Sequence, residues 1–182
     1  VLSAEEDIIA IETELFANCC QKILDQAGPI QTNAKILNRL DVLSTFAYLA
    51  IQKKYCKPIL LEDAVLDVFD GRHPVVEYLL PASERFVGND LQMDVTKSQI
   101  HLITGPNMAG KSTYLRQIGL LVLMAQVGCY VPAKKAAIGI VDRLFTRVGA
   151  SDNLAGGEST FLVEMIEAAN ILNNATPQSL IL

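Results

Sequence analysis

The residues best suited to chemistry are consecutive and run from Gly105 to Ser112, reading GPNMAGKS. They fit the pattern GxxxxGK[ST] of a phosphate-binding loop. Gly105 and Gly110 allow the backbone to curl so that successive N–H groups face one anion. Lys111 supplies a point charge for the β- and γ-phosphates, and the Ser112 hydroxyl can ligate Mg²⁺. The stretch therefore predicts a nucleotide-phosphate site, and a glycine turn beside a chance lysine is the alternative.

A strand and a helix are expected to hold this loop in place. Residues 99–104, reading QIHLIT, form an apolar run that leads into the loop, which is typical of a buried strand. Residues 112–127 carry apolar side chains at helical spacing. The N-terminus of that helix would add the positive end of its dipole to the phosphate site. The side chains expected to face inward are Leu115, Ile118, Leu121, Val122 and Ala125.

A second loop of small and polar residues, SDNLAGGESTF, spans residues 151–161. It ends at Ser159, a suitable N-cap for the helix predicted from there, and a helix N-terminus is a further anion site. Since the first loop already encloses its phosphates, this second site could serve a nucleotide bound to another subunit. From the residues alone, an ordinary loop and helix cap explain the pattern equally well.

Short apolar runs alternate with helical segments after Pro58, and this alternation predicts an α/β fold with a mostly parallel sheet. The run at 90–95 alternates like an edge strand. Residues 159–175 are expected to form a helix, and the predicted strands, besides 99–104, lie at 59–62, 65–79, 90–95, 139–148 and 179–182.

Two long helices are expected to precede this α/β region. Ser3 followed by Glu6 fits a capping box, and helical periodicity continues until Gly28 and Pro29. A second helix is expected over residues 30–54, and its short connection to the first predicts an antiparallel pair. We divide the chain into a helical segment, 1–57, and a nucleotide-binding segment, 58–182.

Composition restricts the classes of function. The net charge of −5 argues against a chain wholly devoted to gripping nucleic acid, which would carry a basic excess. The four cysteines are not in CxxC spacing and do not cluster with the two histidines, so we expect reduced thiols rather than a zinc site. No apolar run reaches the ~18 residues of a membrane span, and we expect no membrane association.

Several motifs together resemble the ATPase region of the MutS family of DNA mismatch repair proteins, in its bacterial form. The match runs in order from about residue 61 to residue 182, and the helices before it resemble the core helices that join the family's DNA clamp to its ATPase. The motifs that carry the resemblance are GRHPVVE, GPNMAGKSTYLRQ, GCYVPA, DRLFTRVGASDNLAGGESTF and EMIEAANILNNAT.

The resemblance implies an ABC-type P-loop NTPase fold that binds ATP or ADP with Mg²⁺. It assigns Lys111 to catalysis, Ser159 to the γ-phosphate of the opposite subunit in a homodimer, and Ser112 to Mg²⁺. Phe86 matches an aromatic that stacks on adenine, although the segment between it and the loop is one residue longer than in the family. The residues assigned to the nucleotide are Phe86, Gly105, Pro106, Asn107, Met108, Ala109, Gly110, Lys111, Ser112 and Thr113.

The resemblance also implies what a complete protein would do. It would be cytoplasmic and nucleoid-associated, bind mismatched double-stranded DNA through domains missing here, switch to a sliding clamp on binding ATP, and recruit MutL. In the family, the strand at 179–182 continues into the Asp–Glu pair of the Walker B motif. This chain stops before that pair, so we expect it not to hydrolyse ATP. Two alternatives remain, namely a recombination-type relative and a module in which the nucleotide is only an allosteric or structural ligand.

Overall fold

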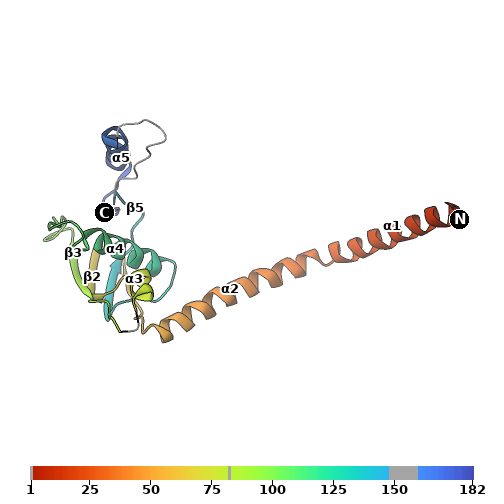
Figure 1. The fold of residues 1–182 in the computed structure, drawn as a ribbon, viewed down its shortest axis with the longest axis horizontal. Helices are drawn as coiled ribbons and strands as arrows, with labels where there is room; N and C mark the ends of the chain where they lie inside the picture. The colour runs from red at the N-terminus through yellow and green to blue at the C-terminus, as the bar shows by residue number, and fades with distance from the viewer. Residues whose placement is uncertain (1, 82, 148–159) are drawn as a thin grey trace. The chain divides into compact units, whose positions relative to one another are not determined.

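The computed structural model describes residues 2–81, 83–147 and 160–182. The chain forms two compact units, residues 1–45 and residues 46–182. The first unit is helical, and the strands of the described chain lie in the second, together with the sequence predicted to bind phosphate (Figure 1).

The N-terminal helices are α1 (Leu2–Leu24) and α2 (Ala27–Gln52), and only two residues separate them. Gly28 and Pro29 were predicted to end the first helix, but they lie in the first turn of α2. Proline is tolerated there because its missing N–H would have had no intrahelical partner. The predicted antiparallel pair is therefore wrong, and the apolar side chains expected to pack within it are exposed: Ile8, Ile11, Leu15, Ile30, Leu37, Leu40 and Ile51.

The main sheet of the second unit has four strands in the order β1-β4-β2-β3. They are β1 (Ile59–Leu61), β2 (Val65–Gly71), β3 (Asn89–Asp94) and β4 (Lys135–Gly139). Strand β2 pairs antiparallel with both of its neighbours, β3 and β4, while β1 pairs parallel with β4. Strand β3 lies at the sheet edge, where its alternating sequence predicted it.

This topology corrects the predicted fold class. The chain is a small α/β fragment with a mixed and mostly antiparallel sheet, and the prediction of an ABC-type P-loop NTPase domain with a mostly parallel sheet is wrong. Alternation of strands and helices suggested parallel crossovers, but the chain leaving β2 returns beside it in the opposite direction. A parallel pair does form between β5 (Leu144–Phe145) and β6 (Leu180–Ile181), with two residues in each strand.

Three local features of the structure also differ from what the sequence predicted. Residues 74–79 form a helix, α3 (Pro74–Leu79), because His73 caps it and Pro74 suits its first turn. Residues 99–104 lie in no strand, and Ile100 and Leu102 are almost fully exposed. Strand β4 was not predicted, since its sequence KAAIG carries little of the β-branched signal of strands.

The core lies between helix α4 (Lys111–Gln126) and the main sheet. Four of the five side chains predicted to face inward from α4 are buried, and Leu115 is half-buried. Burial of this face fixes the rotation of α4 about its axis and therefore the direction of its N-terminal end. The core residues on the sheet and adjoining loops include Leu66, Val68, Leu91, Val131, Ala136 and Ile138.

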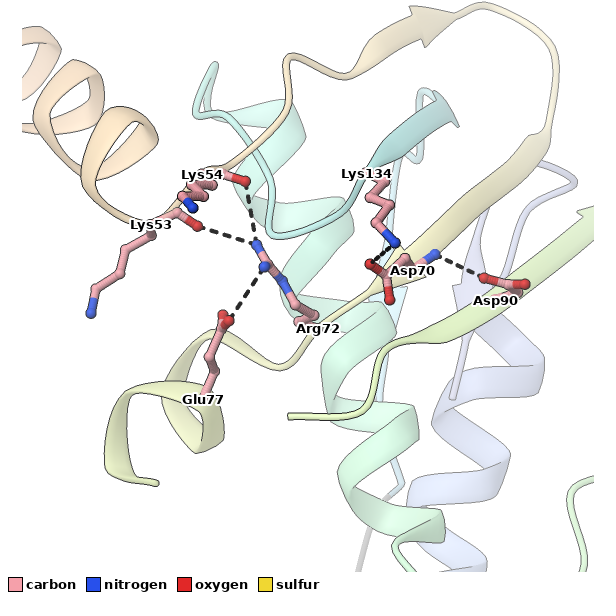
Figure 2. Close-up of polar contacts among 7 residues, drawn as sticks. All are labelled: Lys53, Lys54, Asp70, Arg72, Glu77, Asp90 and Lys134. Atoms are coloured by element: carbon pink, nitrogen blue, oxygen red, sulfur yellow. Dashed lines mark hydrogen bonds and ion pairs between the residues drawn. The ribbon is translucent and has the colours of Figure 1, made fainter. Parts of the chain in front are cut away.

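The pairing of β2 with β3 shifts register between Val68 and Gly71, and Asp70 in this stretch contacts Asp90 and Lys134 (Figure 2). Asp70 has a φ of 52°, a left-handed conformation that is uncommon for a residue with a Cβ atom. Its backbone N–H donates to the Asp90 carboxylate at 2.8 Å, and its own carboxylate pairs with Lys134 Nζ at 3.0 Å. These contacts hold the ends of β2 and β3 in register beside α4.

Candidate functional site

The sequence predicted to bind phosphate, residues 105–110, forms a tight exposed loop immediately before α4. Gly105 has a φ of 150° and Gly110 a φ of 89°, so both glycines adopt backbone conformations that other residues rarely take. Met108 also has a positive φ, 65°, and its side chain is fully exposed. A Cβ atom built on either glycine would meet no atom within 4 Å, so the space around the loop is open.

Lys111 is the charged residue of this loop, and its ammonium group bends back over the backbone. Nζ donates to the carbonyl oxygens of Gly105 and Pro106 at 2.6 and 2.7 Å. The positive charge is therefore held at the loop itself, where the glycines turn the chain. A bound anion could replace the two carbonyl oxygens as the acceptor from the same ammonium group.

The N-terminus of α4 provides the second part of the site. Gly110 is its N-cap, no side chain caps the helix, and no acidic residue lies in its first turn. The first N–H groups of a helix have no intrahelical partner and carry the positive end of its dipole. Ser112 is exposed and Thr113 half-buried in this turn, so the Ser112 hydroxyl is accessible from solvent. This geometry suits an anion, accompanied by a cation that prefers oxygen ligands.

The supporting contacts come from β3 and the end of β2. Tyr114 Oη donates to the carbonyl oxygen of Asp90 at 3.1 Å, which ties the first turn of α4 to β3. One turn further, buried Gln117 accepts a hydrogen bond from Asn89 Nδ2 at 3.1 Å. A Cβ atom on Gly71 would lie 3.0 Å from Gln117 Nε2, so the β2 backbone touches this side chain directly. Sequence reasoning missed these five residues, because only the pairing of β2 with β3 brings them together beside α4.

Phe86 is half-buried in the segment that leads into β3. Strand β3 begins three residues later, and its second residue, Asp90, contacts Tyr114 at the start of α4. The structure thus brings the chain segment of Phe86 to the same side of the unit as α4. It gives no contact between the Phe86 ring and the loop, so the adenine assignment stays a prediction.

A cavity of about 550 Å³ lies beside α4 and the main sheet. It is lined mainly by apolar side chains of the sheet, of α4 and of residues 176–182, and by Ile103 just before the loop. None of residues 105–113 lines it. The cavity is therefore separate from the open surface on which the loop N–H groups and Lys111 lie.

The second predicted loop, with Ser159, lies outside the described residues. The helix after it, α5 (Thr160–Asn174), carries Glu164 and Glu167. Both carboxylates lie 2.7 Å from the guanidinium of Arg147, which follows β5. These two acids are therefore engaged in ion pairs with Arg147.

Residues 2–81, 83–147 and 160–182 contain no cluster of three or more histidine, cysteine, aspartate or glutamate side chains that could hold a metal ion. In the same ranges, the helices are too short or too polar for any of them to cross a membrane.

Comparison with known proteins agrees with the motifs. The family described as MutS domain V matches residues 101–182, and the family described as AAA domain matches residues 77–124. Proteins named DNA mismatch repair protein MutS match the whole chain. They are 57% identical in Chlorobium chlorochromatii and in Chlorobaculum tepidum, and 56% identical in Salinibacter ruber.

The chain spans only about a fifth of the length of these relatives, 20–21%. The match nevertheless includes all 182 residues of this chain. The resemblance first indicated by the sequence motifs is thus confirmed. The chain belongs to the MutS family of DNA mismatch repair proteins.

Proposed function

We propose that residues 105–113 bind the phosphates of ATP or ADP, within a protein that takes part in DNA mismatch repair. The observation that carries this proposal is the position of Lys111, whose ammonium group is held against a loop of left-handed glycines at an uncapped helix N-terminus. Such a site offers backbone N–H groups, a helix dipole and a fixed cation to one anion. The relatives named DNA mismatch repair protein MutS support the biological setting.

Each loop residue has a definite role in this proposal. Gly105 and Gly110 let the backbone turn its N–H groups toward the phosphates, and Lys111 transfers its hydrogen bonds from the loop carbonyls to phosphate oxygens. Asn107, Met108 and Ala109 supply the exposed turn between the glycines. Pro106 and Thr113 border the turn and the helix start, respectively.

Mg²⁺ fits the donor groups of the site. The exposed Ser112 hydroxyl is a hard oxygen ligand, and Mg²⁺ is usually held by one or two protein ligands together with water and substrate phosphates. Ser112 would hold the ion, which would neutralise charge on the β- and γ-phosphates when bound. The protein's own part is to position the hydroxyl in the first turn of α4.

The remaining assignments extend the proposal to the whole protein. We propose a cytoplasmic, nucleoid-associated homodimer that binds mismatched double-stranded DNA and MutL, hydrolyses ATP, and becomes a sliding clamp on binding it. Ser159 would contact the γ-phosphate held by the opposite subunit. Phe86 would stack on adenine. A recombination-type relative is the alternative for the whole protein.

The 182-residue chain is proposed to bind nucleotide without turning it over. Hydrolysis needs a positioned water as well as charge neutralisation at the γ-phosphate. No acidic residue lies in the first turn of α4, and Glu164 and Glu167 are paired with Arg147. We therefore propose that neither Glu164 nor Glu167 activates a water at the loop.

Titration of the chain with ATP, ADP and adenosine, each with Mg²⁺, tests the proposal. Recognition through the phosphates predicts that ATP and ADP bind at least tenfold more tightly than adenosine, because adenosine offers no anion to Lys111 or to the N–H groups of α4. Equal affinity for ATP, ADP and adenosine would show that the loop does not recognise phosphate. A purely allosteric or structural role for the nucleotide predicts binding here but no phosphate release by the full-length protein.

A further inference from the structure

Arg72 joins three separate elements at one corner of the second unit (Figure 2). Its Nη2 donates to the backbone carbonyl oxygens of Lys53 and Lys54 at 3.2 and 3.4 Å, just after the end of α2. Its Nη1 lies 3.4 Å from Glu77 Oε1 on α3. Its backbone N–H donates to the carbonyl oxygen of Pro132 at 2.7 Å.

The contacts at Lys53 and Lys54 complete the C-terminal end of α2. The last carbonyl groups of a helix lack intrahelical donors and carry the negative end of the dipole, so a cation is favoured there. Lys54 has a φ of 53°, the left-handed conformation with which many helices end. Lys53 also places its ammonium group 5.1 Å from the centre of the Tyr78 ring on α3, which is a cation–π contact. The end of α2 is thus tied to α3 twice.

The Arg72 side chain is largely buried, so its guanidinium group needs hydrogen-bond partners within the protein. Its side chain is only 20% exposed. Among the described residues its Nε atom is buried with no hydrogen-bond partner, which costs free energy. Only the planar, five-donor guanidinium can reach the two carbonyl groups and the carboxylate together, and a lysine ammonium could not.

The residue before Arg72 contacts the phosphate-binding helix. Gly71 approaches Gln117 of α4 so closely that a Cβ atom would lie 3.0 Å from Gln117 Nε2. Gln117 is buried and accepts from Asn89, and it lies on the helix that begins with Lys111. The chain of direct contacts therefore runs from the end of α2 through Arg72 and Gly71 to α4.

We propose that Arg72 is a positioning residue that couples the C-terminal end of α2 to the nucleotide site at the start of α4. The coupling part rests on the proposed nucleotide binding. When the end of α2 is held, Gly71 and Gln117 keep α4 in place, and the loop is arranged for phosphate. Thermodynamic linkage requires the reverse effect, so nucleotide should stabilise the end of α2 to the same degree.

Hydrogen–deuterium exchange of the amides of residues 50–56 tests this coupling, with and without Mg²⁺-ADP. In the wild-type chain, nucleotide should slow exchange there. Arg72→Gln should speed exchange in the absence of nucleotide, remove the protection by nucleotide, and weaken ADP binding by about fivefold or more, the low end of typical couplings. Arg39→Gln, which removes an exposed arginine elsewhere on α2, is the matched control and should leave all three unchanged.

A second variant keeps the test decisive if Arg72→Gln does not fold. Glu77→Gln retains the arginine but removes the negative charge beside its Nη1 atom. It should change the exchange rates, the protection by nucleotide and the ADP affinity in the same direction as Arg72→Gln, but less. If ADP slows exchange of residues 50–56 in either folded variant as much as it does in the wild type, the proposed coupling is wrong. If the wild-type chain binds no nucleotide, the proposed function and the coupling both fail. Exchange without nucleotide then still shows whether Arg72 holds the helix end.

Discussion

The ammonium nitrogen of Lys111 lies 2.6 Å from the carbonyl oxygen of Gly105. This contact closes the loop on itself, since the two residues stand at its opposite ends. The cation is therefore held at the mouth of the loop, which would reduce the conformational entropy lost on binding of the proposed anion. An ordered lysine at an uncapped helix N-terminus is the structural basis of the nucleotide-binding proposal.

Replacement of Gly71 by alanine should destabilise the second unit. The added Cβ atom would lie 2.8 Å from Val68 Cγ1, which is closer than real Cβ contacts, and would be tightly placed at 3.0 Å from Gln117 Nε2 and 3.2 Å from the carbonyl oxygen of Asn89. Overpacking of this kind costs about 1–3 kcal/mol in the free energy of unfolding. Chemical denaturation measures the change. Gly28→Ala is the control, because its Cβ atom would meet nothing within 4 Å, and it should be neutral or slightly stabilising. Equal stability of the two variants would contradict the close approach of Gly71 to α4.

Stability should fall with pH as His73 becomes protonated. Burial, with the nearby charge of Arg116 as a smaller cause, lowers the pKa of His73 below its ordinary value of 6.5. Its Nδ1 accepts from the Val76 N–H at 3.2 Å and caps α3, which only an unprotonated nitrogen can do. Because the unfolded chain binds the proton more readily, the stabilisation is complete above pH 6.5. It declines as pH falls from there toward the lower pKa of the folded state.

Melting temperatures measured across this range test the role of His73. His73→Asn keeps a side-chain acceptor at the cap but cannot titrate, so its melting temperature should vary less with pH than that of the wild type. Identical pH profiles for the two proteins would exclude His73 as the source of the effect.

The sequence predicted the glycine turn and the helix after it well, and the reason is local, while phosphate binding by that turn stays a prediction. The glycines, Lys111 and the apolar face of α4 are read within 25 residues of one another, and the helix begins one residue before the predicted position. Similarly, β3 was predicted as an edge strand from its own alternation. Features set by short-range geometry were therefore accessible without the structure.

The direction of the strands was not accessible in this way. Antiparallel pairing of β2 with β3 and β4 depends on contacts between residues far apart in the sequence, such as Val68 with Leu91 and with Ala136. The supporting residues of the site depend on the same pairings. Arg72 is an example, since its carbonyl partners lie 18 and 19 residues earlier and nothing in the local pattern GRHP points to them.

Phe86→Ala tests the adenine assignment in the full-length protein. Stacking on an aromatic ring contributes about 0.5–1.5 kcal/mol beyond the burial of area, so ATP binding should weaken about three- to tenfold. Affinity for inorganic tripolyphosphate, which has no base, should stay the same. Phe69→Ala, which removes an exposed phenylalanine beside Lys134, is the matched control and should leave ATP binding unchanged. Normal ATP affinity in folded Phe86→Ala would remove Phe86 from the site.

Ser159→Ala tests action across a dimer in the full-length protein. Hydrolysis should fall more than binding of the first nucleotide, because the serine would act on the phosphate of the opposite subunit. Mixing this variant with Lys111→Ala should restore activity, since one interface would then combine an intact loop with an intact Ser159. Failure to recover activity at any ratio, in dimers shown to be mixed, would argue against the role in trans.

The most direct test of the account is calorimetric titration of Mg²⁺-ADP into the wild-type chain and into Lys111→Ala. Loss of a charge-assisted hydrogen bond costs about 1.5–3 kcal/mol, so the affinity of the variant should fall about tenfold to a hundredfold. Lys135→Ala, an exposed lysine on β4 away from the loop, is the matched control and should bind as the wild type does. Equal affinity of the wild type and Lys111→Ala, with both proteins folded, would contradict phosphate binding by this loop.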